Sequence, residues 1–212
     1  MSKHYYDISK RLFDIILSFF LLVMMLPVVV GASIMIAVTS EGPIVFKQKR
    51  VGRGGRLFTC YKFRSMIYDA DQKQYIEFIA RAFKDAYGNG VPNSHLEFKK
   101  DDSRVTKIGR FLRVTSIDEL PQLMNVLKGE MSLIGPRPDV PESVALYSAS
   151  ERRRLEVKPG ITGLWQVNGR STLTLREMFV LDNFYVDNKS LLLDLRILIK
   201  TVFVVIIMRG SG

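Results

Sequence analysis

The feature that most constrains this chain is an apolar stretch, residues 15–40, that contains no charged side chain. At about 1.5 Å per residue, a helix over this stretch would reach about 39 Å, which is longer than the hydrocarbon core of a bilayer. The stretch is too long for a signal peptide, and no small-residue cleavage site separates it from the charged remainder of the chain. We therefore expect it to stay in the mature protein and to lie in the membrane.

Basic residues on both sides of this stretch constrain its topology. Those before it are Lys3, Lys10 and Arg11, and those after it are Lys47, Lys49, Arg50, Arg53 and Arg56. The positive-inside rule places both flanks on the cytoplasmic side, which a straight spanning helix cannot achieve. Pro27 lies near the middle, where it removes a backbone hydrogen bond and bends a helix. The charge symmetry favours a re-entrant membrane helix, residues 1–40, that breaks at Pro27, and the alternative is a kinked spanning helix.

The charge of the remaining chain indicates an anionic partner. The protein has 212 residues, and we expect residues 41–212 to form a single domain together with the anchor. Its 31 Lys and Arg residues outnumber 21 Asp and Glu residues, for a net charge of +10. Such a balance points to nucleic acid, an anionic lipid surface or phosphorylated substrates. Nucleic acid fits poorly, because no helix-turn-helix or aromatic–basic interleaving stands out.

The cysteine and histidine content excludes two further classes of site. The single cysteine, Cys60, cannot form an internal disulfide and fits a reducing cytosol. It lies in a strand-like run, so we expect a buried structural thiol. His4 and His95 are far apart and lack cysteine partners, so a zinc site has no support.

The pattern after the apolar stretch predicts a mostly helical α+β fold with one short β-hairpin. Two strands are expected at residues 44–48 and 57–61, joined by a glycine-rich turn at residues 52–55. Helices are expected at residues 69–87, 105–114 and 142–156, with an exposed loop at 88–93 and an irregular segment at 158–163. The last segment, residues 191–208, fits an amphipathic helix in the membrane interface about as well as a buried core helix.

Two adjacent carboxylates, Asp118 and Glu119, lie where a helix is expected to start. Pro121 is tolerated only in the first turn of a helix, so the helix should begin at or just before Asp118. Ser116 and Glu119 have the spacing of a capping box, which predicts the same start. Taken alone, acidic residues at this position have a structural explanation, because they stabilise the helix dipole.

The basic residues around this pair favour phosphate chemistry instead. Arg110 and Arg113 lie just upstream, Arg137 lies between two prolines downstream, and Lys62 and Arg64 follow the hairpin. Arginine forks match phosphate oxygens, and rigid prolines hold such a fork in place. A carboxylate beside them can hold Mg²⁺ or attack phosphorus directly. The sequence therefore predicts a phosphate-handling site at the membrane.

Several long motifs resemble the bacterial sugar transferases, the monotopic phosphoglycosyl transferases. The motifs are Lys10-Arg11-Leu12-Phe13-Asp14, Tyr61-Lys62-Phe63-Arg64-Ser65-Met66, Thr115-Ser116-Ile117-Asp118-Glu119-Leu120-Pro121-Gln122-Leu123, Met131-Ser132-Leu133-Ile134-Gly135-Pro136-Arg137-Pro138 and Lys158-Pro159-Gly160-Ile161-Thr162-Gly163-Leu164-Trp165-Gln166, with residues 187–194 extending the match. The resemblance runs essentially from end to end. One departure is Leu26-Pro27 at the helix break, where such proteins often have Ser-Pro.

The resemblance implies an enzyme of the cytoplasmic face of the bacterial inner membrane. It would move a sugar-1-phosphate from a UDP-sugar to undecaprenyl or another polyprenol phosphate and release UMP, as the first membrane step of glycoconjugate synthesis. Asp118 would be the nucleophile that forms a phosphosugar-aspartyl intermediate, and Asp118 and Glu119 would hold Mg²⁺. Downstream glycosyltransferases are possible partners, and nucleic acid is not expected. The substrate-binding residues expected are Arg113, Arg137, Lys62, Arg64 and Pro136, of which Arg113 and Arg137 match phosphate-binding positions.

Two other classes of protein fit part of this pattern. A non-enzymatic membrane-surface module would use the basic residues for anionic lipid, would need no metal and would tolerate Asp118→Asn. A membrane-bound hydrolase with the same carboxylates would release free sugar phosphate into water.

Overall fold

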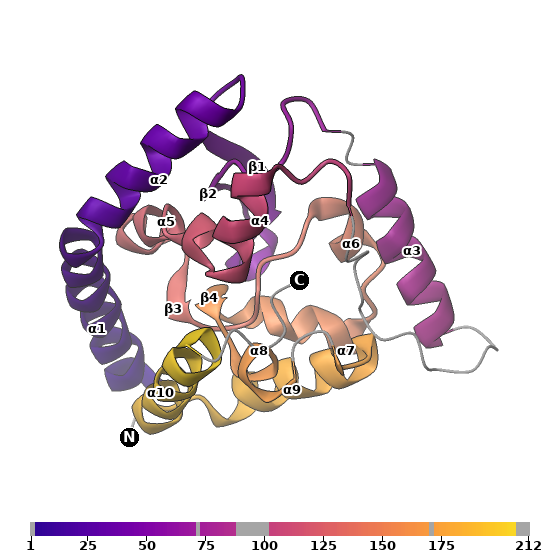
Figure 1. The fold of residues 1–212 in the computed structure, drawn as a ribbon. Coiled ribbons are helices and arrows are strands. Elements are labelled where there is room, and N and C mark those ends of the chain that lie inside the picture. Colours follow the sequence, from indigo (N-terminus) through magenta and orange to yellow (C-terminus); the bar gives the residue numbers. More distant parts are fainter. Residues whose placement is uncertain (1–2, 71–72, 88–101, 170–171, 207–212) are drawn as a thin grey trace.

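The computed structural model describes residues 3–70, 73–87, 102–169 and 172–206, and within them it shows a mostly helical α+β fold (Figure 1). The α-helices are α1 Lys3–Met24, α2 Leu26–Thr39, α3 Lys73–Tyr87, α4 Lys107–Val114, α5 Gln122–Lys128, α6 Pro141–Ala145, α7 Ala149–Arg152, α8 Leu164–Asn168, α9 Leu175–Asn188 and α10 Leu191–Ile206. The strands are β1 Val45–Val51, β2 Leu57–Phe63, β3 Ser132–Ile134 and β4 Gly160–Thr162, and the 3₁₀ turns are η1 Arg53–Gly55, η2 Ile117–Glu119 and η3 Arg153–Glu156. The loop expected at residues 88–93, His95 and the last two residues of the expected C-terminal helix lie outside the described residues.

The apolar opening forms two helices, α1 and α2, that meet at a bend of 60°. The break falls at Met25, two residues before Pro27, because the proline occupies the first turn of α2, where no hydrogen-bonded N–H is required. Among the described helices, none alone is long and apolar enough to cross a bilayer, whereas the bent pair together passes by length and composition. The expected interruption of the apolar helix is therefore present, with its boundary shifted.

One side of α1 is fastened to the body of the protein by a buried carboxylate. Asp14 Oδ1 accepts hydrogen bonds from Ser132 Oγ at 3.1 Å, from the Leu133 backbone N–H at 3.1 Å and from Lys10 Nζ at 3.0 Å. The opposite side of α1 exposes large apolar side chains, including Ile16, Phe19 and Val23. One face of α1 is thus held to the protein by the hydrogen bonds of Asp14, and the opposite face is apolar and exposed.

The expected β-hairpin is present and is two residues longer in each strand than its core pattern indicated. β1 and β2 pair antiparallel, with Val45 opposite Phe63 and Val51 opposite Leu57. The turn between them contains Gly54 and Gly55 with φ of 67° and 79°, a conformation that glycine adopts without steric cost.

A second sheet occupies the segment expected to be irregular. β4 pairs parallel with β3, so the expectation of an irregular segment over residues 158–163 is wrong at its centre. The two backbones approach so closely that a Cβ on Gly160 would lie 2.2 Å from the Gly135 backbone N, and one on Gly163 would lie 2.4 Å from the Gly135 carbonyl O. Glycine is required here because a side chain would collide with the neighbouring backbone. The strands were not predicted because three residues show too little alternation of polar and apolar side chains to be recognised from sequence.

Two expected helices have different boundaries in the structure. The helix expected at residues 142–156 is divided into α6, α7 and η3, and the side chain of Ser148 caps the new start at α7 in a capping box with Glu151. The helix expected from residue 69 is α3, which begins at Lys73. Asp69 has a φ of 62°, and a residue in this left-handed region cannot continue a right-handed helix.

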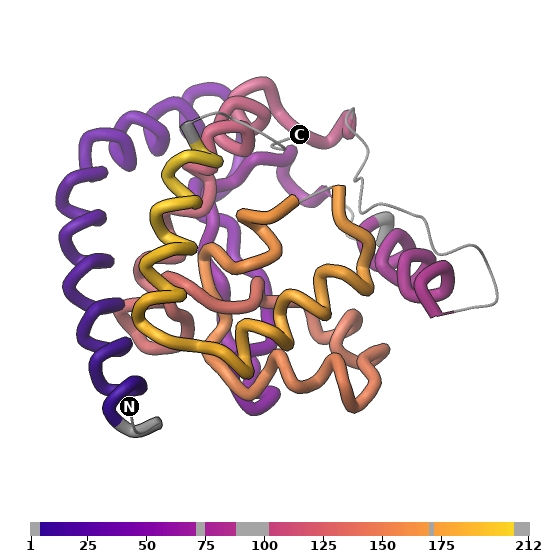
Figure 2. Tube along the Cα trace, turned by 90° about the horizontal axis from the view of Figure 1, so that it is seen from below, coloured from indigo at the N-terminus to yellow at the C-terminus, as the bar shows by residue number. Residues whose placement is uncertain are grey.

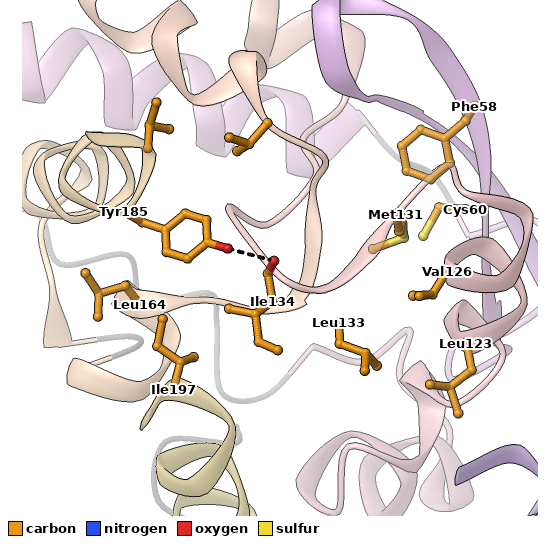
Figure 3. Packing of buried hydrophobic residues seen from close by; sticks show 12 residues of the cluster. Phe58, Cys60, Leu123, Val126, Met131, Leu133, Ile134, Leu164, Tyr185 and Ile197 are labelled. Carbon is orange, nitrogen blue, oxygen red and sulfur yellow. Dashed lines mark hydrogen bonds between the residues drawn. The ribbon is translucent and has the colours of Figure 1, made fainter. Parts of the chain in front are cut away.

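The main hydrophobic core joins the hairpin, α5, β3 and the C-terminal helices (Figure 3). Cys60 is buried in it, as expected, beside Met131. Figure 2 shows α10 running alongside α1. The α10 helix buries Ile197 and Asp194, as a core helix does, and its location in the membrane interface stays a prediction. An opposite set of large apolar residues is exposed, namely Leu192, Leu195, Ile199, Val202 and Phe203.

Candidate active site

The two adjacent carboxylates lie on η2, the short turn between α4 and α5. Ser116, just before this turn, has a φ of 58°, a left-handed conformation that is uncommon for a residue with a side chain. Its side chain makes no capping hydrogen bond, and α5 begins only after Pro121. The expected helical start just before Asp118 is present, as the 3₁₀ turn η2 and not as an α-helix, whereas the expected capping box is wrong. The left-handed residue reverses the chain, so the carboxylates belong to a strained turn, a setting frequent at functional sites.

Close packing with β2 and its continuation fixes the position of this turn. The Asn125 side chain on α5 accepts the backbone N–H of Tyr61 at 3.1 Å and donates to the carbonyl of Thr59 at 2.7 Å. On α4, a Cβ on Gly109 would lie 1.9 Å from the carbonyl oxygen of Ser65. The helices on either side of η2 are thus locked to the same strand and its extension, which leaves η2 little freedom.

Glu119 joins two segments that are distant in sequence. Its Oε1 accepts hydrogen bonds from Lys62 Nζ at 2.9 Å and from Arg137 Nη2 at 2.6 Å. Burial alone would raise the pKa of Glu119, but the charges of Arg137 and Lys62 outweigh it and hold the pKa well below its ordinary value. Glu119 is therefore ionised throughout the physiological range and ties β2 to the 135–138 loop.

The pKa of Asp118 is shifted in the opposite direction from that of Glu119. Asp118 is 8 % exposed, and no described residue donates a hydrogen bond to its carboxylate. Burial and the negative charge of Glu119 raise the pKa of Asp118 to about 6, against the partial compensation of Lys62, Arg137 and Arg113. Two neighbouring carboxylates whose pKa values are pushed apart in this way are a common signature of acid–base or nucleophilic sites.

Arg113 contributes a third cation beside Asp118. Its Nε donates to Ser65 Oγ at 2.9 Å, which orients the guanidinium. Burial lowers the pKa of Arg113, and the charge of Asp118 is the main influence that raises it again. The structure thus places Lys62, Arg113 and Arg137 in the electrostatic surroundings of Asp118, and their contact with substrate stays a prediction.

Backbone contacts hold the loop that carries Arg137. Arg154 Nη2 donates to the carbonyl of Arg137 at 2.8 Å, and Arg50 Nη1 donates to the carbonyl of Pro138 at 3.0 Å. Pro136 is buried, and its carbonyl accepts the Gly160 backbone N–H at 2.9 Å. Pro136 thus shapes the loop through its backbone. The sequence did not predict that Arg50 and Arg154 support this loop. Each lies in a run of basic residues, a pattern that is typical of a solvated surface.

Arg64 is turned toward the C-terminal end of α2. Its Nη2 donates to the backbone O and side-chain Oγ of Ser40 at 2.7 Å and 2.8 Å, and its Nη1 donates to the carbonyl of Pro43. These contacts tie the end of α2 to the hairpin. The structure therefore does not bring Arg64 into the ion-paired group around Glu119. The expected contact of Arg64 with substrate stays a prediction.

The carboxylate pair fits Mg²⁺ in its chemistry. The described residues contain no cluster of three or more potential metal-binding side chains. They do contain the unpartnered Asp118 carboxylate next to Glu119, whose hydrogen bonds from Lys62 and Arg137 both end on Oε1. Mg²⁺ commonly takes one or two carboxylates and completes its shell with water and substrate phosphates. Asp118 and the second oxygen of Glu119 are suited to that role.

These features bring a buried carboxylate, an ion-paired carboxylate and three cations together in one site. The bacterial sugar transferase profile matches residues 5–208, and the chain belongs to this family.

Individual relatives cover the chain almost completely. It is 43% identical over 203 residues to the uncharacterized sugar transferase EpsL of Bacillus subtilis, covering 96% of this chain and 90% of EpsL. It is 41% identical over 208 residues to the undecaprenyl-phosphate galactose phosphotransferase of Salmonella typhimurium, covering 95% of this chain and 41% of that protein. It is 38% identical over 205 residues to the UDP-glucose:undecaprenyl-phosphate glucose-1-phosphate transferase of Klebsiella pneumoniae, covering 92% of this chain and 40% of that protein. The chain therefore spans most of EpsL and less than half of the other two.

Proposed function

We propose that this protein transfers a sugar-1-phosphate from a UDP-sugar to undecaprenyl phosphate or a related polyprenol phosphate, and releases UMP. The observation that carries the proposal is the Asp118–Glu119 pair, in which one carboxylate is ion-paired and the other is buried without a partner. Similarity over more than 90% of this chain to the two transferases with named donors or acceptors, of which it spans less than half, supports the same reaction. The product would be the lipid-linked sugar with which capsule, O-antigen, exopolysaccharide or glycan synthesis begins, and downstream glycosyltransferases would extend it.

In the first step, a carboxylate oxygen of Asp118 attacks the sugar-bearing phosphorus of the donor. The bond from that phosphorus to the bridging oxygen breaks, and UMP leaves with this oxygen, so the sugar phosphate becomes an acyl phosphate on Asp118. The lack of a hydrogen bond to Asp118 favours attack, because no donor has to be displaced from the nucleophile. Arg113 and Arg137 are placed to bind phosphate oxygens through charge-assisted hydrogen bonds.

In the second step, a phosphate oxygen of the lipid attacks the same phosphorus and releases the Asp118 carboxylate. The two steps use one site in turn, so the donor and the long lipid never need to occupy it together. The ionised Glu119 holds Lys62 and Arg137 in position through both steps. When bound at the carboxylate pair, Mg²⁺ would neutralise phosphate charge.

The anchor fits this use of a lipid substrate. We propose that α1 and α2 enter the cytoplasmic leaflet of the bacterial inner membrane and return to the same face, with the catalytic residues on the cytoplasmic side. The 60° bend and the basic residues on both flanks support this monotopic arrangement.

The test is UMP release by purified protein in nanodiscs, with Mg²⁺, undecaprenyl phosphate and a panel of UDP-sugars. Asp118→Asn is the test variant, and the exposed Asp187→Asn is the matched control. We expect multiple-turnover UMP release that requires lipid phosphate and Mg²⁺. This release should be abolished in Asp118→Asn and retained in the control. Without acceptor, the wild type should release at most one UMP per protein and hold the sugar phosphate covalently. Continued release of free sugar phosphate without acceptor would identify a hydrolase instead, and unchanged activity in Asp118→Asn would reject the nucleophile.

A further inference from the structure

A cavity of about 170 Å³ lies beside the N-terminal half of α1, and no side chain that we assign to the catalytic reaction lines it in the described part of the chain. Segments from α1, η1, β3, the approach to β4 and the end of α9 meet there. Its lining includes five basic side chains, Lys10, Arg11, Arg53, Lys158 and Lys189, and two carboxylates, Asp7 and Asp14. Two of the motifs quoted above, which begin at Lys10 and Lys158, meet in this cavity without a place in the proposed reaction.

Two of these cations already have internal partners. Lys10 Nζ lies 3.0 Å from Asp14 Oδ1, and both groups are buried. Arg11 donates to the carbonyl oxygens of Val126 and Leu127 at 2.6 Å and 2.8 Å, which satisfies the end of α5. These contacts hold α1 against the body and account for the first two basic residues.

The side chains of Lys158 and Arg53 have no such internal partners among the described residues. In the described part of the chain, neither side chain makes a hydrogen bond or an ion pair. A Cβ built on Gly129 would lie 3.3 Å from Arg11 Nη2 and 3.6 Å from Lys158 Nζ, so the two cations converge on one point. Burial and the nearby charge of Arg11 lower the pKa of Lys158; Asp14 and Asp7 oppose this and Arg53 adds to it. Positive charge therefore exceeds negative charge around this half-buried amine.

A structural explanation covers only part of this arrangement. Cations near the C-terminus of a helix are stabilised by its dipole, and α5 ends at Lys128. Arg11 alone already provides the hydrogen bonds to the last carbonyls, and Arg53 belongs to the hairpin turn. Gathering further cations into a concave site where they outnumber the carboxylates is unfavourable unless an anion joins them.

We propose that this cavity is a second anion site, which binds a phosphate group between Lys158 and Arg53 with Arg11 behind it. Lysine and arginine are the side chains that bind phosphate oxygens most strongly, through charge-assisted hydrogen bonds. The same chemistry is offered by the phosphodiester of an anionic phospholipid and by a free phosphate. The exposed apolar residues Ile8 and Leu12 on the same half of α1 place the cavity close to the surface expected to meet lipid.

The test measures binding and does not depend on catalysis. The full chain is reconstituted in nanodiscs of phosphatidylcholine, and its thermal unfolding midpoint is followed during two titrations. One titration adds inorganic phosphate against chloride of equal ionic strength, and the other raises the fraction of phosphatidylglycerol in the disc. The test variant is Lys158→Gln/Arg53→Gln. The matched control is Arg81→Gln/Lys84→Gln, which removes the same charge from the exposed side of α3.

We expect wild type and control to show a saturable rise of the midpoint with at least one of the two probes. The apparent affinity of Lys158→Gln/Arg53→Gln for that probe should fall by about tenfold or more, because two charge-assisted contacts are lost. A response to phosphatidylglycerol alone would identify the lipid headgroup, and a response to inorganic phosphate would identify a free phosphate. No saturable response of the wild type to either probe would overturn the proposal, and so would an equal response of the two double variants. If the test variant fails to fold, Lys158→Arg, which keeps the charge, must retain binding, and its loss would overturn the proposal as well.

Discussion

Arg137 Nη2 lies 2.6 Å from Glu119 Oε1, and this contact joins the loop after β3 to the turn that carries Asp118. Lys62 Nζ reaches the same oxygen from β2 at 2.9 Å. One ionised carboxylate therefore holds two cations in place while its sequence neighbour is left without a partner. The proposed nucleophile and the proposed phosphate-binding groups are thus organised by a residue that need not itself react.

Replacing Asp118 with asparagine should separate activity from stability. The pKa of Asp118 is raised to about 6, so ionising it costs the folded protein more than the unfolded chain. This penalty grows as pH rises from about 4 to about 6 and is complete above about 6. We expect Asp118→Asn to abolish UMP release yet to increase the free energy of unfolding at pH 8 by on the order of 1–3 kcal/mol, with a smaller gain at pH 5. Denaturant unfolding at both pH values checks this, and a variant less stable than the wild type at pH 8 would contradict it.

The pH dependence of the transferase reaction should follow the same group. Nucleophilic attack needs the ionised carboxylate, whose fraction falls as pH drops through about 6. The first-step rate should therefore fall about tenfold for each pH unit below about 5.5. Glu119 stays ionised there because its pKa is held below the ordinary value. Single-turnover UMP release between pH 4.5 and 8 measures the profile, and a rate that is flat down to pH 4.5 would argue against Asp118 as the group that titrates.

Arg154 should be the main stabilising contact behind the Arg137 loop. Its Nη2 lies 2.8 Å from Asp182 Oδ2, and both side chains are almost fully buried. Arg154→Met would leave Asp182 buried and unpaired, and we expect a loss of about 3–5 kcal/mol in the free energy of unfolding.

The neighbouring Arg153 provides the matched control for this prediction. Its ion pair with Asp187 is exposed, so Arg153→Met should change stability little. The double variant Arg154→Met/Asp182→Asn should recover part of the loss, because it removes the unpaired charge. Equal unfolding free energies for Arg153→Met and Arg154→Met would show that the buried pair has no special weight.

A single methyl group at Gly109 should disturb the site. The added Cβ would meet the Ser65 carbonyl oxygen at 1.9 Å, and α4 would have to move away from the segment that orients Arg113. We expect Gly109→Ala to destabilise the protein by about 1–3 kcal/mol and to reduce transferase activity. Gly31→Ala is the control, because outside its own helix backbone no described residue lies within 4 Å of a Cβ there. Thermal unfolding and UMP release measure both variants, and equal behaviour of the two would refute the packing argument.

The limits of sequence reasoning are visible around η2. The adjacency of Asp118 and Glu119 and the surrounding cations were readable, because residue types and their proximity along the chain are explicit. The capping box was wrong because Ser116 adopts a left-handed conformation, which the residue pattern does not indicate. The fate of Arg64 was equally hidden, since its guanidinium reaches Ser40, which is 24 residues away.

The sequence by itself determined the interrupted apolar anchor, the glycine-turned hairpin and the composition of the site, because these depend on hydrophobic runs, turn chemistry and neighbouring residues. Only the tertiary structure decided which carboxylate is ion-paired, which arginine supports the Arg137 loop and that β3 pairs with β4. Such outcomes depend on burial and on contacts between distant segments. Burial and charge then determine the pKa values that distinguish Asp118 from Glu119, although the two residues are adjacent in the chain.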